Sequence, residues 1–309
     1  GISQREAQKD QNECYDDSFH LHAVRIGRFI ISYDNQSTYN NNMALTNTEL
    51  KNFKSLRTQR RADRNRFLAE GIRLLEESVR HRVKAETVLV CDDKLGDRGR
   101  TLVGRMERLG AEIRHVPARQ LDAIVDAETS QGIAAVFSRA EVVIGQLEPV
   151  KDRRVLICDG ISDPGNLGTL FRSALAFGFP VVAVCGESAT AFSPKTVRAS
   201  VGAVFGLTIV EASASVVLEW IARNKIVLLE AESGGEPLSS VAVHLRKGTA
   251  SALAVGSEAR GLSAEIRKAS AHSVGISHES AVESLNAAVA GSILMKGLYD
   301  LCQGTRTRS

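Results

Sequence analysis

Three polar segments of the chain each follow an apolar run and carry side chains that can do chemistry. They comprise residues 159–172, 253–262 and 276–286. Their amide, carboxylate, hydroxyl and guanidinium groups can contact and orient a bound ligand. We therefore take them as candidate walls of one active site, provided that the fold brings them together.

The first segment contains Asn166, which stands where a helix N-cap belongs, and Arg172, which lies on the second turn of the expected helix. Gly168 and Arg172 are four residues apart on one helical face, so the missing side chain at Gly168 would let a ligand approach the guanidinium. The competing interpretation is an ordinary capped helix whose arginine faces solvent.

The second and third segments also admit two interpretations. In the second, an expected strand runs into Gly256, where a ligand could approach the bare backbone, and Glu258 follows. In the third, Ser284 could cap the final helix and Asn286 would lie in its first turn. The alternatives are a plain strand-to-helix turn for the second segment and a capping box alone for the third.

The second half of the chain alternates apolar runs with helical patterns. Strands are expected at residues 155–158, 181–185, 207–210, 226–229, 252–255 and 274–276, and a final helix over about 284–301. Near-continuous apolar strands joined by helices predict a parallel sheet that is covered on both faces. Ligands of such sheets bind in loops at the carboxyl ends of the strands, which is where the three polar segments lie.

A smaller α/β domain is predicted before this one, with a basic helix over about residues 47–62 and a last strand at 132–137. The polar stretch 1–43 shows no sustained periodicity, and we expect a disordered leader that precedes a natural start at Met43. The predicted organisation is a leader at 1–43, a first domain at 44–140, a second domain at 150–303 and a tail at 304–309.

Positive charge is concentrated in the stretch from Lys51 to Arg66, which holds seven basic residues against the single acid Asp63. A solvated helix usually mixes both signs, so this stripe favours contact with nucleic-acid phosphates over a bland surface. The residues predicted to make these phosphate contacts are Lys54, Arg57, Arg61, Arg64 and Arg66. Phe53 and Leu56 are expected in the core.

Several function classes lack their motifs. No G-x-G-x-x-G follows a strand, which disfavours a nucleotide-dependent oxidoreductase, and no P-loop, G-x-S-x-G elbow or H-E-x-x-H is present. The five scattered cysteines form no C-x-x-C pair, so neither a disulfide nor a metal site is expected. No run is long and apolar enough for a bilayer, and we expect a cytoplasmic protein without a membrane partner.

Taken together, the three segments resemble the three motifs of the SpoU/TrmH family of RNA methyltransferases, within the SPOUT superfamily. The matching residues are Asp163-Pro-Gly-Asn-Leu-Gly168 with Phe171-Arg172, then Val255-Gly-Ser-Glu258 with Gly261-Leu262, then Ser284-Leu-Asn286. Their order and spacing match over about residues 150–302, and Arg66–Gly71 resembles part of the family's amino-terminal substrate-binding domain. The resemblance therefore covers nearly everything after Met43.

The resemblance implies an RNA 2′-O-ribose methyltransferase that uses S-adenosylmethionine and needs no metal. It implies a SPOUT domain with a deep trefoil knot, a first domain like ribosomal protein L30e or L7Ae, and a homodimer. We expect rRNA rather than tRNA as the substrate, because the separate L30e-like domain resembles those of rRNA-modifying members. The alternative is a catalytically inactive RNA- or ribosome-binding protein of the same fold.

The resemblance also assigns roles to individual residues. The cofactor would lie against Gly256, Ser257, Ile276 and Leu285, mainly along the backbone. The reaction site would be lined by Asn166, Arg172, Glu258, Ser284 and Asn286, with Asn166 orienting Arg172 or the ribose. The sequence departs from the family pattern at Ser277, His278 and Ser280, where members often carry Pro, Met and Gly, so the loop over the adenine is expected to differ in shape.

Overall fold

The structure is a computed structural model that describes residues 44–58, 65–127, 130–139, 142–147, 154–245, 249–279 and 281–304. The expected leader and the last five residues of the expected tail lie outside the described residues. No helix in the described ranges is long and apolar enough to cross a membrane.

The first sheet has four strands in the order β1-β4-β2-β3. They are β1 (Arg66–Glu70), β2 (Thr87–Val90), β3 (Glu112–His115) and β4 (Ile133–Ser138). Only β2 and β3 pair in parallel, whereas β4 runs antiparallel to both β1 and β2. The α-helices of this part are α1 (Asn47–Thr58), α2 (Ile72–Arg80), α3 (Asp97–Arg108) and α4 (Ala118–Ile124).

The helix pattern of the first part follows from its apolar spacing. Leu102 and Met106, four residues apart, are both buried under α3, and Gly110 follows the helix with a φ of 86° that favours glycine. Phe53 is half-buried and Leu56 fully buried, as expected. Strand β1 was not predicted from the alternation, because its three buried residues are too few to show a period.

The second sheet has six strands in the order β10-β8-β9-β5-β6-β7, and every pair is parallel. The strands are β5 (Arg154–Asp159), β6 (Val181–Cys185), β7 (Thr208–Glu211), β8 (Val227–Pro237), β9 (Ser251–Gly256) and β10 (His272–Gly275). The central strands are buried along almost their whole length, which explains why they read as continuous apolar runs. Strand β8 continues well past the predicted end at residue 229, into the exposed residues 232–234.

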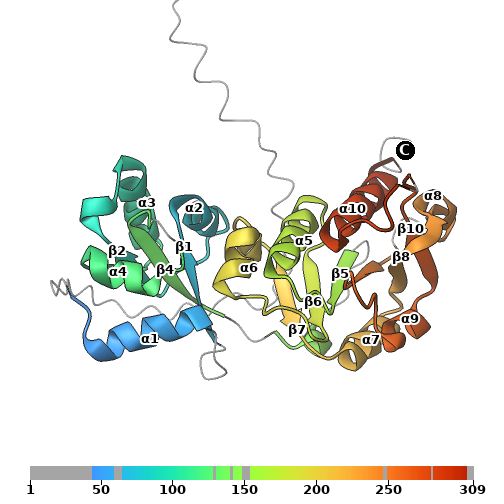
Figure 1. The fold of residues 1–309 in the computed structure, drawn as a ribbon, viewed down its shortest axis with the longest axis horizontal. Coiled ribbons are helices and arrows are strands. Elements are labelled where there is room, and N and C mark those ends of the chain that lie inside the picture. The colour runs from blue at the N-terminus through green and yellow to red at the C-terminus, as the bar shows by residue number, and fades with distance from the viewer. Residues whose placement is uncertain are drawn as a thin grey trace, which may run out of the picture. The chain divides into compact units, whose positions relative to one another are not determined.

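Helices lie on both sides of this sheet (Figure 1), as the sequence predicted. On one side are α5 (Pro164–Ala176) and α10 (Ala287–Gly304), and on the other are α7 (Ala214–Arg223) and α9 (Ala264–Ala269). The shorter helices are α6 (Pro194–Ala199) and α8 (Leu238–Val241), and one-turn 3₁₀ segments occur at 92–94, 144–146, 203–205 and 242–244. Cys91, Cys158 and Cys185 are free and buried.

Gly168 does not leave room for a ligand, contrary to the expectation from its spacing to Arg172. It is buried where α5 crosses α6, and a Cβ added to it would lie 2.5 Å from Cβ of Ala199 and 2.7 Å from the backbone oxygen of Thr196. The absent side chain therefore allows the two helices to pack closely.

We predict that Gly168→Val lowers the free energy of unfolding by about 1–3 kcal/mol or more, because the added carbons meet backbone that cannot move aside. Urea denaturation followed by circular dichroism measures this change. Gly104→Ala, in α3, is the matched control, since nothing lies within 4 Å of its added carbon, and it should hold or raise stability. Equal midpoints for Gly168→Val and the wild type would contradict the packing role.

Candidate active site

The start of α5 is fixed by Asp163, whose Oδ1 accepts a hydrogen bond from the backbone N–H of Asn166 at 2.7 Å. Pro164 follows as the first helical residue, a position at which its fixed φ and missing N–H are tolerated. The prediction that Asn166 caps the helix is therefore wrong. Because Asp163 performs the capping, the amide side chain of Asn166 is available for the site.

The start of α10 is fixed by Asn286, whose Oδ1 accepts hydrogen bonds from the backbone N–H groups of Ala288 at 3.0 Å and Val289 at 3.2 Å. The prediction that Ser284 caps this helix, with Asn286 in the first turn, is also wrong. Ser284 and Leu285 precede the helix in an irregular segment, because the chain turns into the helix only at Ala287.

Glu258 joins the two helix starts. Its Oε1 accepts hydrogen bonds from Nδ2 of Asn286 at 2.5 Å, from Nδ2 of Asn166 at 3.1 Å and from the backbone N–H of Ala287 at 3.2 Å. Asn286 also donates to Oδ1 of Asn166 at 3.1 Å. The carboxylate thus lies at the amino end of α10, where the helix dipole favours negative charge.

A short closed loop holds Glu258 in this position. Ser257 and Gly261 exchange two backbone hydrogen bonds, at 3.1 and 2.8 Å, and the N–H of Ser263 donates to Oδ2 of the buried Asp159 at 2.7 Å. A Cβ on Gly256 would lie 2.3 Å from the carbonyl carbon of Gly261. The missing side chain at Gly256 therefore makes room for the returning loop. From the sequence, we had expected it to make room for a ligand.

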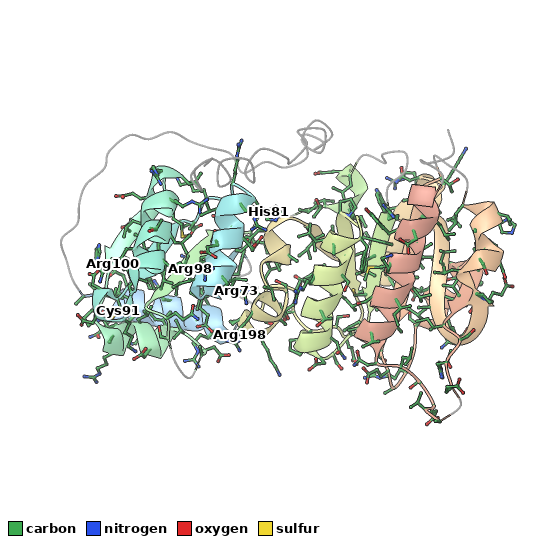
Figure 2. All side chains as sticks on the ribbon, turned by 90° about the horizontal axis from the view of Figure 1, so that it is seen from above. Arg73, His81, Cys91, Arg98, Arg100 and Arg198 are labelled. Atoms are coloured by element: carbon green, nitrogen blue, oxygen red, sulfur yellow. The ribbon has the colours of Figure 1, made fainter. Side chains whose placement is uncertain are left out.

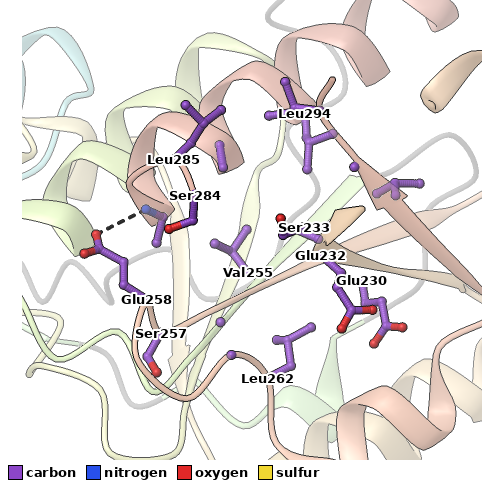
Figure 3. Close-up of a pocket in the computed structure, with 18 of the residues that line it drawn as sticks. Glu230, Glu232, Ser233, Val255, Ser257, Glu258, Leu262, Ser284, Leu285 and Leu294 are labelled. Carbon is purple, nitrogen blue, oxygen red and sulfur yellow. Dashed lines mark hydrogen bonds between the residues drawn. The ribbon is translucent and has the colours of Figure 1, made fainter. Parts of the chain in front are cut away.

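A cavity of about 280 Å³ opens beside this loop, between the middle of β8, the ends of β9 and β10 and the start of α10. Gly256, Ser257, Ile276 and Leu285, which are the four residues predicted to contact a cofactor, all line it. Glu258 and Ser284 line it as well (Figure 3). His278, from the segment that departs from the family pattern, also lines it, whereas Ser280 lies outside the described residues.

The lining of this cavity fits S-adenosylmethionine. Its volume is near the lower end of the ~300–1,000 Å³ range of small-molecule sites. Val255, Leu262 and Leu294 offer an apolar wall against which an adenine ring can lie. Glu230 offers a carboxylate oxygen, Oε2, that is buried and accepts no hydrogen bond from any described residue. Burial raises the pKa of this carboxyl above its ordinary value, and the neighbouring Glu232 adds to the rise.

A second cavity of about 590 Å³ is lined by Asn166 and shares Ser257, Glu258, Gly261, Leu262 and Ala287 with the first. Arg172 lines neither cavity. It is exposed on α5 and makes no hydrogen bond or ion pair with another described residue. The structure therefore brings Asn166, Glu258, Ser284 and Asn286 together, and leaves Arg172 on the same helix as Asn166 without contact to it. No group of three or more possible metal ligands occurs among the described side chains.

The predicted RNA-binding residues differ in their surroundings. Lys54 is exposed on α1 and Arg66 begins β1, whereas Arg61 and Arg64 lie outside the described residues. Arg57 pairs with Oδ1 of Asp126 at 3.3 Å. The other carboxylate oxygen of Asp126 accepts a hydrogen bond from Arg198 of α6, which is labelled in Figure 2. This hydrogen bond is the main reason that the pKa of Asp126 lies below its ordinary value. Sequence analysis did not find this link, because Asp126 and Arg198 lie far from the basic stretch.

The assignment of the α10 cap leads to a stability prediction. Asn286→Ala should lower the free energy of unfolding by at least about 0.5–2 kcal/mol, the usual cost of losing an N-cap. Asn286→Asp keeps the cap but should not restore full stability, because its carboxylate would face that of Glu258 in place of the Nδ2 donor. Ser284→Ala is the control and should change little. Chemical denaturation of the three variants measures these differences. A loss at Ser284→Ala as large as at Asn286→Ala would show that the serine is the cap after all.

Comparison with known proteins agrees with this geometry. Residues 153–296 match the SpoU rRNA methylase family and residues 47–135 match the MRM3-like substrate-binding domain. The chain is 31% identical to the 23S rRNA (guanosine(2553)-2′-O)-methyltransferase RlmP of Bacillus subtilis over 251 residues, which cover 81% of this chain and 95% of the relative.

Two solved structures share the fold. One is a putative RNA methyltransferase of the TrmH family from Porphyromonas gingivalis, with a TM-score of 0.66 and 28% identity, over 82% of this chain and 97% of that one. The other is the SpoU methyltransferase AviRb of Streptomyces viridochromogenes in complex with AdoMet, with a TM-score of 0.73 and 24% identity, over 84% and 99%. With the three motifs meeting at Glu258 and a relative matched over nearly its whole length, the chain belongs to the SpoU rRNA methylase family.

Proposed function

We propose that this protein transfers a methyl group from S-adenosylmethionine to a ribose 2′-hydroxyl of rRNA. The observation that carries the proposal is the meeting of Asn166, Glu258 and Asn286 at the edge of the 280 Å³ cavity. Relatives named as 23S rRNA 2′-O-methyltransferases, in Bacillus subtilis and in Streptomyces viridochromogenes, support rRNA over tRNA as the substrate.

The methyl donor supplies an activated methyl group on a sulfonium, so the protein has to position the reactants and help a proton leave a weakly acidic hydroxyl. Gly256, Ser257, Ile276 and Leu285 would hold the donor, since all four line the cavity. Asn166 and Asn286, locked to Glu258, would keep the loops on either side of the reacting atoms at a fixed distance. Ser284 would contribute its hydroxyl at the rim of the same cavity.

Arg172 would stabilise the alkoxide that develops on the ribose and the adjacent phosphate. A guanidinium is almost never neutral in proteins, so this role suits it better than that of a general base. Its exposure and the lack of a partner among the described residues leave its five donors available to RNA. Asn166 would orient the ribose, because its side chain is engaged with Glu258 and Asn286 and not with Arg172.

The two parts of the chain that contain the two sheets would have different functions. Residues 150–303 would form the catalytic domain, with the knotted path of a SPOUT fold. Residues 44–140 would form an RNA substrate-binding domain like L30e or L7Ae. In that domain Lys54 and Arg66, together with Arg61 and Arg64 outside the described residues, would contact phosphates, while Arg57 would have to exchange Asp126 for RNA. A cytoplasmic location stays a prediction.

The competing function is a catalytically inactive RNA- or ribosome-binding protein of the same fold. The intact network of Asn166, Glu258 and Asn286 favours an enzyme, because binding RNA alone would not require these groups around a cavity. Transfer of labelled methyl groups to rRNA, followed by mapping of 2′-O-methyl sites, decides between the two. Binding of rRNA without methyl transfer would support the inactive protein.

Arg172→Ala should lose at least about 10²-fold to 10³-fold in methyl transfer, because one preorganised charge at a developing anion is commonly worth that much. Arg172→Lys should also fail, since a point charge does not reproduce a planar fork of donors. Single-turnover transfer to rRNA measures the rate, and calorimetry with S-adenosylmethionine should show nearly unchanged binding. Arg223→Ala on α7, an exposed arginine across the sheet, is the control and should keep its rate. A near-normal rate for Arg172→Ala would overturn the mechanism.

A homodimer is the remaining proposal from the sequence. Leu294 and Leu298 of α10 turn out to be buried in the core, but Val289 and Ile293 are 47% and 46% exposed on one face of the helix, four residues apart. Light scattering should therefore give about twice 33.3 kDa, and Ile293→Glu should lower that mass. Val216→Glu on α7, with 46% exposure, is the matched control and should leave the mass unchanged. A fully active monomer would refute the dimer.

A further inference from the structure

Glu230 is a carboxylate that the mechanism above does not use. It lies on β8, it lines the 280 Å³ cavity, and its side chain is half-buried. Its Oε2 is buried and accepts no hydrogen bond from the described residues. A buried acceptor without a donor costs about 1–3 kcal/mol, and more for a charged group, so an unpaired one in a native fold calls for an explanation.

The two other carboxylates of the cavity wall already have donors. Glu232, two residues along β8, accepts from Nη1 of Arg267 at 3.0 Å and from Oγ of Ser273 at 3.2 Å. Glu258 accepts from three donors at the far side of the cavity. Of these three cavity carboxylates, Glu230 is therefore the one with a buried acceptor to which no described residue donates.

The position of Glu230 separates it from the reaction centre. Figure 3 shows Glu230 and Glu258 at opposite sides of the cavity, with Val255 and Leu262 between them. A ligand whose reactive end lies near Glu258 would place its other end near Glu230. S-adenosylmethionine carries hydrogen-bond donors away from its methyl group, namely the ribose hydroxyls, the adenine amino group and the α-ammonium.

We propose that Glu230 accepts a hydrogen bond from one of these donor groups and thereby positions the cofactor in the cavity. This inference rests on the proposed function and deepens it. Glu230 acts as a positioning residue in this role, since it lies away from the atoms that react. Because Oε2 is buried, the carboxylate has to turn to bring this acceptor to a donor in the cavity, and binding of the cofactor then pairs it.

The test compares Glu230→Gln and Glu230→Ala with the wild type in calorimetric titrations with S-adenosylmethionine. Both variants should bind about 10-fold to 100-fold more weakly, which corresponds to losing a hydrogen bond to a charged group. Glu236→Gln is the control, because Glu236 lies on the same strand, is exposed and does not line the cavity. It should bind as the wild type does.

Thermal melting separates this role from a structural one. Without cofactor, the two Glu230 variants should melt at the wild-type temperature or above it, because a desolvated carboxylate has been replaced by a neutral side chain. With cofactor, their rise in melting temperature should be smaller than that of the wild type. Variants that melt lower without cofactor, and bind it with unchanged affinity, would overturn the proposal.

Titration with 5′-methylthioadenosine identifies the donor. This compound keeps the adenine and the ribose but lacks the ammonium and the sulfonium charge. A loss of its affinity in the Glu230 variants assigns the bond to the adenosyl part, and an unchanged affinity assigns it to the ammonium. If the wild type binds S-adenosylmethionine but the variants bind it equally well, the role of Glu230 is wrong and the proposed function stands. If the wild type itself does not bind it, both are wrong.

Discussion

The carboxylate of Glu258 is the point at which three distant parts of the chain are tied together. It binds Asn166, which is 92 residues away, and Asn286, which is 28 residues away, and it accepts the first N–H of α10. This hydrogen-bond network requires that β5, β9 and β10 end at the same edge of the sheet, which a fully parallel sheet provides. The loops can adopt these positions only because the glycines and caps at their ends allow it.

The elements of the second sheet could be predicted from the sequence, since buried parallel strands are continuous apolar runs. The predicted and observed bounds of β5, β6 and β9 differ by no more than one residue at each end. The cap residues could not be predicted, because Asp163 and Asn166, like Ser284 and Asn286, are all good N-caps by type. Which one caps depends on where the chain leaves its extended path, and tertiary packing decides that.

The roles of the glycines could not be predicted from the sequence either. A missing Cβ permits the close approach of any atom, whether of a ligand or of the protein's own backbone. At Gly168 the approaching atoms belong to α6, and at Gly256 they belong to the returning Gly261–Leu262 segment. The count of charged residues between Lys51 and Arg66 was also incomplete, because it considered only residues inside that stretch. It could not include Asp126, which neutralises Arg57 from outside that stretch.

The cavity shows why a functional site can keep an interaction that folding alone would not favour. Glu258 is satisfied by the protein itself, so the loops around it are formed before any ligand arrives. Oε2 of Glu230 receives no hydrogen bond from the described part of the chain, and burial raises the pKa of this carboxyl because it disfavours the charged form. A chain optimised for stability alone would replace such a carboxylate with an apolar side chain. A donor supplied by a ligand would complete the pair, and the free energy lost by desolvating the carboxylate would then contribute to the affinity for that ligand.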